Sequence, residues 1–228
     1  MLWCACSNVL SRKYEYEEEV FLGLDNTATV YVNASVPALV ALRGLDLPVD
    51  PNARLDQQVV RAYYETPVSH VASVTTSRRD GRRYVHIRIE VPEITRLREA
   101  PPFAWSFYNF VGIDYDGEVE YSYTQRFQDA AGQDVGDVGW SGSELVALRV
   151  HVPSKITNLP FGTVERGNIV VLEQPLADRL KGVPLEARIR MEGKSILVNT
   201  LTLFGAMMAA VVVTFAAAIW FVKTRKVG

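Results

Sequence analysis

The most constraining feature of the chain is an uncharged segment near its C-terminal end. No Asp, Glu, Lys or Arg occurs over residues 195–222, and three basic residues follow within the next four positions. A helix needs roughly 20 apolar residues to cross the hydrocarbon layer, and aromatic rings such as Trp220 and Phe221 prefer its boundary. The segment predicts a transmembrane helix over residues 196–222 and a basic tail over 223–228. A buried core helix is the alternative.

The residues before this helix are numerous enough for one domain with a substantial core. We expect that domain to span residues 14–192. Three of the 24 basic residues lie in the tail, so 21 basic residues stand against all 26 acidic ones before the helix. A domain with this negative balance lacks the basic surface that nucleic acid requires, so we expect no nucleic-acid partner.

The two cysteines lie close together at the N-terminal end, where a disulfide between them could not cross-link distant parts of the domain. Leu2-Trp3-Cys4-Ala5-Cys6-Ser7 resembles the end of a bacterial lipoprotein signal, in which Cys6 would be acylated. A secretory signal contains about 7–15 apolar residues before its cleavage site, more than precede Cys6 here. We interpret residues 1–13 as the remnant of such a signal, with Cys6 as the lipidation site. The alternative is an incidental thiol in a disordered end.

Three pairs of strand-like runs are separated by short polar turns. In the second pair, Asp80-Gly81 suits the positive φ values of a tight hairpin turn. Valine and isoleucine alternate with polar residues over 84–91, which predicts one buried and one solvated face. The predicted hairpins comprise residues 14–24 with 27–34, 68–77 with 84–91, and 103–115 with 118–127.

Short helices are predicted over residues 36–42, 53–65 and 92–100. In the second, Leu55, Val59, Ala62 and Tyr63 share one face, which we expect to pack on the sheet. Residues 128–143 are rich in glycine and predict a loop. Further strands are predicted near 146–152, 169–172 and 185–191. The order of elements predicts an α+β fold, with a mainly antiparallel curved sheet and two or three short helices.

The sequence contains no recognisable metal or cofactor signature. His70, His86 and His151 lie in separate strands without the spacing of a zinc site, so we expect each at the surface or a sheet edge. Phosphate-binding glycine loops and a nucleophile elbow are also missing. We therefore expect no metal, no cofactor and no enzymatic activity. The glutamates at positions 15, 17, 18 and 19 could bind a hard cation, but a solvated strand face is the favoured interpretation.

The third hairpin concentrates aromatic side chains. An ordinary core explains them, and the alternative is a pocket or groove for an acyl chain. The candidate ligand-binding residues of such a pocket are Trp105, Phe107, Tyr121 and Tyr123.

Arginines recur at outward-facing strand positions. Guanidinium groups suit phosphate oxygens, so Arg88, Arg149, Arg188 and Arg190 are candidates for binding lipid headgroups. Surface ion pairs with neighbours such as Glu90 and Glu186 are the alternative explanation.

The order of features over residues 151–170 resembles the mycobacterial LppM-like lipoproteins. A strand ends at Pro153, an Asn- and Gly-containing turn follows, and Gly167-Asn168 precedes a β-branched strand shortly before the membrane helix. The resemblance covers residues 145–226 in motif order. It implies a lipidated N-terminus, an α+β domain, a C-terminal anchor and an association with envelope lipids, but no individual binding residue.

We therefore expect a membrane-anchored bacterial envelope protein whose domain binds lipid or another apolar envelope ligand, with membrane lipids as partners. The alternative is an interaction or sensing module for a membrane-protein partner, for which Gly205 and Ala209 provide a small-xxx-small spacing. Basic residues flank the helix three against three and do not orient it. The signal-like start and the resemblance predict a single-pass cell-membrane protein with an extracytoplasmic domain and a cytoplasmic C-terminus.

Overall fold

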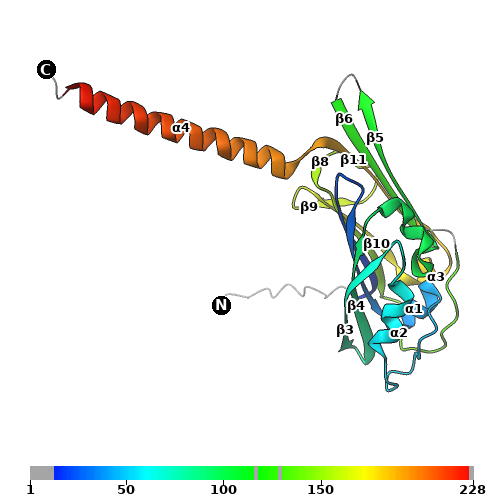
Figure 1. The fold of residues 1–228 in the computed structure, drawn as a ribbon. Helices are drawn as coiled ribbons and strands as arrows, with labels where there is room; N and C mark the ends of the chain where they lie inside the picture. Colours follow the sequence, from blue (N-terminus) through cyan, green and yellow to red (C-terminus); the bar gives the residue numbers. More distant parts are fainter. Residues whose placement is uncertain (1–12, 116–117, 128–129, 226–228) are drawn as a thin grey trace, which may run out of the picture.

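The computed structural model describes residues 13–115, 118–127 and 130–225. It contains two β-sheets, several short helices and one long C-terminal helix that projects away from the domain (Figure 1). This arrangement confirms the predicted α+β class. Cys6 and the rest of residues 1–12, residues 116–117 between the strands of the third predicted hairpin, residues 128–129 and residues 226–228 lie outside the described residues.

The large sheet has seven strands in the order β3-β4-β2-β1-β7-β10-β9. Neighbouring strands are antiparallel except β1 and β7, which run parallel. A parallel pair requires a long crossover, and between β2 and β7 the chain first adds β3 and β4 to this sheet and then forms a hairpin of the small sheet described below. Its strands are β1 (Tyr14–Leu22), β2 (Ala28–Ser35), β3 (His70–Arg79), β4 (Arg82–Val91), β7 (Leu145–His151), β9 (Thr163–Glu165) and β10 (Ile169–Pro175).

The small sheet has four antiparallel strands in the order β5-β6-β11-β8. They are β5 (Ser106–Tyr115), β6 (Glu118–Phe127), β8 (Ser154–Asn158) and β11 (Leu185–Ser195). The sequence predicts one sheet, whereas the chain forms two, and β8 and β9 were not predicted. Strand β11 leads directly into the long helix α4 (Ile196–Arg225).

Turn chemistry correctly identifies the hairpin of β3 and β4. Asp80 and Gly81 have φ values of 51° and 74°, as the tight turn requires. The alternating valine and isoleucine side chains of β4 are all buried, which confirms their predicted inward orientation. The hydrophobic core lies between the inner faces of the two sheets and beneath the helices, which Figure 1 shows on the side of the domain away from α4.

Helix α1 (Val36–Arg43) begins where the Ser35 hydroxyl accepts a hydrogen bond from the Ala38 N–H, and it ends at Gly44, which has φ 67°. These caps explain why the predicted helix forms at this place. The helix contributes most of its side chains to the core.

Helix α2 (Gln57–Tyr64) is shorter than predicted because Asp56 caps its start by accepting from the Gln58 N–H. Its predicted buried face is only partly correct: Leu55 and Tyr63 pack against the core, whereas Val59 is 46% exposed and the fully buried residues are Val60 and Tyr64. The segment predicted as a helix over 92–100 is the 3₁₀ helix η1 (Ile94–Glu99), followed by η2 (Pro101–Phe103). Helix α3 (Leu176–Leu180) was not predicted.

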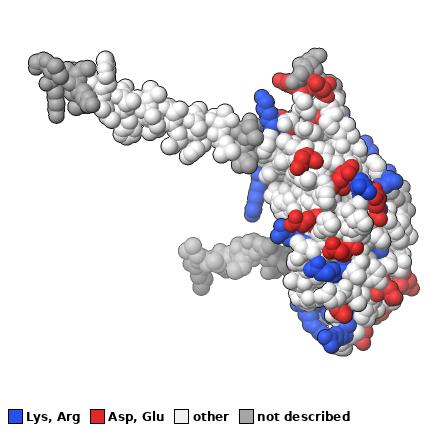
Figure 2. All heavy atoms as spheres, viewed as in Figure 1, with Lys and Arg blue, Asp and Glu red and all other residues white. Residues whose placement is uncertain are grey.

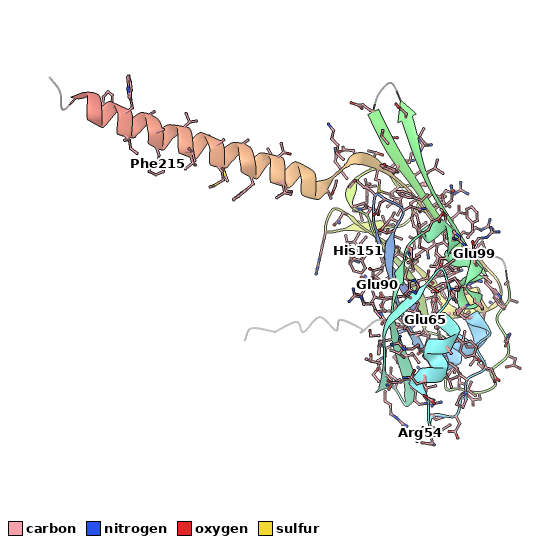
Figure 3. All side chains as sticks on the ribbon, in the orientation of Figure 1. Arg54, Glu65, Glu90, Glu99, His151 and Phe215 are labelled. Carbon is pink, nitrogen blue, oxygen red and sulfur yellow. The ribbon has the colours of Figure 1, made fainter. Side chains whose placement is uncertain are left out.

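Within α4, residues Thr200–Phe221 have the length and composition of a membrane span, and none of this window is buried against protein. The core-helix alternative is therefore wrong. The Thr200 and Thr214 hydroxyls each donate to the carbonyl four residues earlier, at 2.8 Å, so these polar groups are satisfied within the helix. Apolar side chains such as Phe215 point outward along its length (Figure 3).

Candidate functional site

The four candidate aromatic residues do not share one surface. Phe107 lies opposite Arg126 in the β5–β6 ladder, whereas Tyr121 lies opposite Gly112, so the two side chains project from opposite faces of the small sheet. Phe107 is 38% exposed. Tyr121 is half-buried and stacks on Phe110, with ring centroids 5.1 Å apart. The structure therefore brings Tyr121 to the inner face and leaves Phe107 outside.

Tyr123 lies on the inner face with Tyr121 and is fully buried, and its hydroxyl donates to Gln125 Oε1 at 2.8 Å. Trp105 is half-buried and precedes the first residue of β5. Neither of them lines the cavity described below. Tyr123 belongs to the hydrophobic core, against which Tyr121 also packs, whereas Trp105 is not one of the core residues.

The candidate arginines are divided between the two sheets. Arg88 and Arg149 lie on the outer face of the large sheet, and both are paired: Arg88 Nη2 is 2.9 Å from Glu90 Oε1, and Arg149 Nε is 2.6 Å from Glu17 Oε1. Arg188 pairs with Glu186 on the outer face of the small sheet. Arg190 is exposed, and within the described part of the chain it has no carboxylate at ion-pair distance. Three of the four cations are thus already partly neutralised.

The acidic run of β1 is not the solvated face that the sequence predicts. Glu15 and Glu18 are fully buried, and Glu17 and Glu19 are half-buried on the outer face. The reason is that two buried arginines from distant elements supply opposite charge, since an unpaired carboxylate would be too costly to bury.

Glu18 is the centre of a buried network between the two sheets. Its Oε2 accepts from Arg43 Nη2 at 2.9 Å and from the Tyr16 hydroxyl at 2.7 Å. Its Oε1 accepts from the Tyr108 hydroxyl at 2.8 Å and from the Gln125 amide. Burial and the nearby Glu18 charge raise the pKa of Tyr108 well above its usual range, so this hydroxyl stays protonated and can donate.

Arg43 completes this network. Its Nε donates to the Tyr16 hydroxyl at 2.9 Å and its Nη1 to Ser106 Oγ at 3.0 Å, while its guanidinium stacks over the rings of Tyr16 and Phe127. Burial alone would lower the pKa of Arg43, but the neighbouring Tyr16 and Glu18 raise it, so the arginine remains charged. The network satisfies its members internally and joins α1, the large sheet and the small sheet.

Glu15 forms a second buried cluster. Its Oε1 accepts from Arg82 Nη2 at 2.9 Å and from the Tyr84 hydroxyl at 2.6 Å, and its Oε2 accepts from Trp140 Nε1 at 3.2 Å. Arg82 also donates to the Gly139 carbonyl at 2.8 Å. These contacts hold the glycine-rich loop against the sheet. No group of three or more metal-binding side chains occurs within the residues the structure describes.

An open cavity of about 520 Å³ lies where α4 leaves the domain, and we call it the junction cavity. The Ile196 N–H donates to the Pro153 carbonyl at 2.9 Å, which fixes the first residue of α4 to the residue before β8. Asn168 Nδ2 donates to the Val152 carbonyl at 3.0 Å and holds the opposite wall. The cavity is lined by Val152, Pro153, Lys155, Arg166, Gly167, Asn168, Ser195 and Ile196.

The junction cavity has a basic rim that the sequence did not indicate. Arg166 and Gly167 form the turn between β9 and β10 with φ values of 51° and 84°, and this turn presents the exposed Arg166 side chain. Lys155 Nζ is 3.1 Å from Glu192 Oε1, and Lys194 is exposed next to the lining residue Ser195. Figure 2 shows basic side chains on both sides of the base of α4. Arg166-Gly167 is a sequence that favours a tight turn, and it was the available indication that a basic side chain is presented here.

No protein-family model matches the sequence, and no curated protein matches it. Among solved structures, the fold is similar to the NMR structure of the folded domain of the LppM protein from Mycobacterium tuberculosis. The two chains are 13% identical, the TM-score is 0.41, and the alignment covers 81% of this chain and 94% of that one. This is a distant likeness of fold, from which no ligand and no binding residue of this chain follows.

Proposed function

We propose that the chain is a single-pass membrane protein whose domain lies against the bilayer surface and binds membrane lipid there, without catalysing a reaction. One observation carries the proposal: β11 ends at Ser195 and α4 begins at Ile196, so no linker separates the domain from the membrane helix. The hydrogen bond from Ile196 to Pro153 ties the helix to β8 as well. A domain attached in this way must stay within reach of lipid headgroups.

The charge distribution supports the same proposal. The candidate arginines on the sheets are mostly paired to glutamates, whereas the cations around the base of α4 include exposed residues without such partners among those described. Anionic lipids attract basic residues held close to the membrane surface. Lipid binding at the helix base therefore agrees with the structure better than an acyl-chain pocket in the aromatic hairpin.

A photoactivatable lipid tests the proposal. The full chain would be placed in nanodiscs that contain a diazirine-labelled phosphatidylglycerol, irradiated, digested and mapped by mass spectrometry. We expect cross-links within residues 150–196 as well as in the membrane span. Cross-links confined to Thr200–Phe221 would contradict lipid binding by the domain.

The envelope location, the acylation of Cys6 and the extracytoplasmic orientation belong to the same proposal. Mass spectrometry of the N-terminal peptide would detect diacylglycerol on Cys6. Protease applied to intact spheroplasts should digest the domain if it lies outside the cytoplasmic membrane. Protection of the domain would reverse the proposed orientation.

An interaction module for a membrane-protein partner is the second candidate. Phe107 and Val111 are 38% and 42% exposed on the same face of β5, which is an edge strand of the small sheet. Exposed apolar groups beside an open sheet edge suit contact with another protein. Replacement of both by serine would abolish partner capture in this case and would leave the lipid cross-links unchanged.

A further inference from the structure

We propose that the junction cavity binds the phosphate group of an anionic lipid from the leaflet that surrounds the base of α4. This inference rests on the proposed function and names both the site and the chemical group it recognises. Three independent properties of the cavity support it: its depth relative to the membrane, its charge, and the apolar part of its lining.

The position of the cavity along α4 matches the headgroup layer. Thr200 is the first residue of the membrane span, and Ile196 lines the cavity four residues earlier. At a rise of about 1.5 Å per residue, this separation is roughly 6 Å along the helix axis. Each headgroup layer adds about 5–7 Å to the hydrocarbon core, so the cavity lies at the depth of lipid phosphates when α4 spans the bilayer.

The charge of the cavity rim suits a phosphate. Arg166 is exposed and has no ion-pair partner among the described residues, so its guanidinium is available for two parallel hydrogen bonds to phosphate oxygens. Lys155 and Lys194 add positive charge, and Glu192 offsets part of it through its contact with Lys155. Glu165 does not neutralise Arg166, because it lies 3.9 Å from Arg149 and lines a different cavity.

The remaining lining fits a lipid rather than a free anion. Val152, Pro153 and Ile196 provide apolar lining, and Ile196 lies four residues before the start of the membrane span. The N-terminal end of α4 lies at the same place and contributes partial positive charge to a group bound there. A phosphodiester with a glycerol and acyl chains attached would contact both the basic rim and the apolar lining.

Lipid retention by the full chain tests the site. Protein would be purified in nanodiscs of phosphatidylcholine alone or mixed with phosphatidylglycerol, and native mass spectrometry would count the lipids that each chain retains. We expect selective retention of phosphatidylglycerol by the wild type. Arg166→Gln should weaken this retention roughly tenfold, because charge-assisted hydrogen bonds to phosphate are lost. Addition of Lys155→Gln to that variant should weaken the retention further.

Arg54→Gln is the matched control. Arg54 is also exposed and without an ion-pair partner among the described residues, and Figure 3 shows it at the end of the domain away from α4. This variant should retain phosphatidylglycerol as the wild type does. An equal loss in Arg54→Gln would mean that general charge, not the junction cavity, attracts the lipid, and would overturn the inference.

Three further outcomes would also overturn it. If Arg166→Gln keeps wild-type retention while the domain still cross-links to lipid elsewhere, the junction site is wrong and the proposed function stands. If cross-links are confined to the membrane span, both fail. Binding of inorganic phosphate to the chain in phosphatidylcholine nanodiscs, as tightly as phosphatidylglycerol, would assign the site to a free anion instead of a lipid.

Discussion

The Glu18–Arg43 network and the junction cavity are both rich in charged side chains, but the charges are buried and paired in the network and exposed at the cavity. In the network, the carboxylate and the guanidinium are buried and have protein partners on every side. At the junction cavity, Arg166 is exposed and is presented by a turn. The comparison indicates that the buried charges specify how the sheets pack, whereas the junction cations are left for a group outside the protein.

Removal of the buried cation should have the largest effect. In Arg43→Met, Glu18 would remain buried without its counter-ion, and we expect a loss of about 3–5 kcal/mol in the free energy of unfolding. Urea unfolding of the full chain in detergent measures it. Arg88→Met removes an exposed ion pair and should cost less than about 1 kcal/mol. Equal losses in the two variants would contradict the distinction between the regions.

Removal of one neutral partner of Glu18 should cost less. Tyr108→Phe deletes the hydroxyl that donates to Glu18 Oε1 at 2.8 Å and keeps the ring in the core. We expect a loss of about 1–3 kcal/mol, because one hydrogen bond to a buried charge disappears. Tyr31→Phe, which changes a half-buried tyrosine of the outer face, is a suitable control. An unchanged urea midpoint for Tyr108→Phe would show that water replaces the hydroxyl.

His86 is less buried than the Glu18–Arg43 network and more buried than Arg166. It should make the free energy of unfolding depend weakly on pH. The half-buried ring is hydrogen-bonded through Nε2 to the Ser77 hydroxyl and through Nδ1 to Asn33 Oδ1. Burial, together with the charge of Arg79, lowers the pKa of His86. Because the folded state disfavours the protonated ring, this stability is present above about pH 6.5, the unfolded value, and is lost as pH falls through the folded pKa.

Unfolding midpoints at neutral and mildly acidic pH check this expectation. His86→Gln should reduce the loss of stability on acidification. The effect should stay below about 1 kcal/mol, since the side chain is only partly buried. A steeper acid loss in His86→Gln would reverse the assigned sign.

The smallest effect on stability is expected at the junction cavity. Arg166→Gln should change the free energy of unfolding in neutral detergent by less than about 0.5 kcal/mol, because an exposed arginine without a protein partner contributes little. The same variant should lose lipid retention, as proposed above. A large destabilisation would mean that Arg166 has a structural role, and the contrast between the two regions would disappear.

Local chemistry made part of this fold predictable. The long apolar C-terminal helix, the Asp80-Gly81 turn and the buried face of β4 each depend on neighbours in sequence, and the structure contains all three. The burial of Glu15 and Glu18 was not predictable in the same way. Their partners Arg82 and Arg43 lie far away in sequence, and only the assembled sheets bring them together.

The candidate aromatic site could have been refined from the sequence. The predicted pairing of residues 103–115 with 118–127 places Phe107 opposite position 126 and Tyr121 opposite position 112, as the strands show, which puts the two aromatic side chains on opposite faces. By contrast, the pairing of β11 with β8, which brings Ser195 beside Ser154 at the junction cavity, joins segments separated by other elements. No local pattern encodes that arrangement.

The direct passage from β11 into α4 has a mechanical consequence. Gly193 lies so close to the Val119 backbone that an added Cβ would approach its carbonyl oxygen to 2.4 Å, and two residues later Ser195 is paired with Ser154. This close packing and pairing leave the chain little freedom to act as a hinge. A thinner bilayer should increase the tilt of the helix, and the small sheet should rotate with it. The orientation of the domain on the membrane should therefore depend on bilayer thickness.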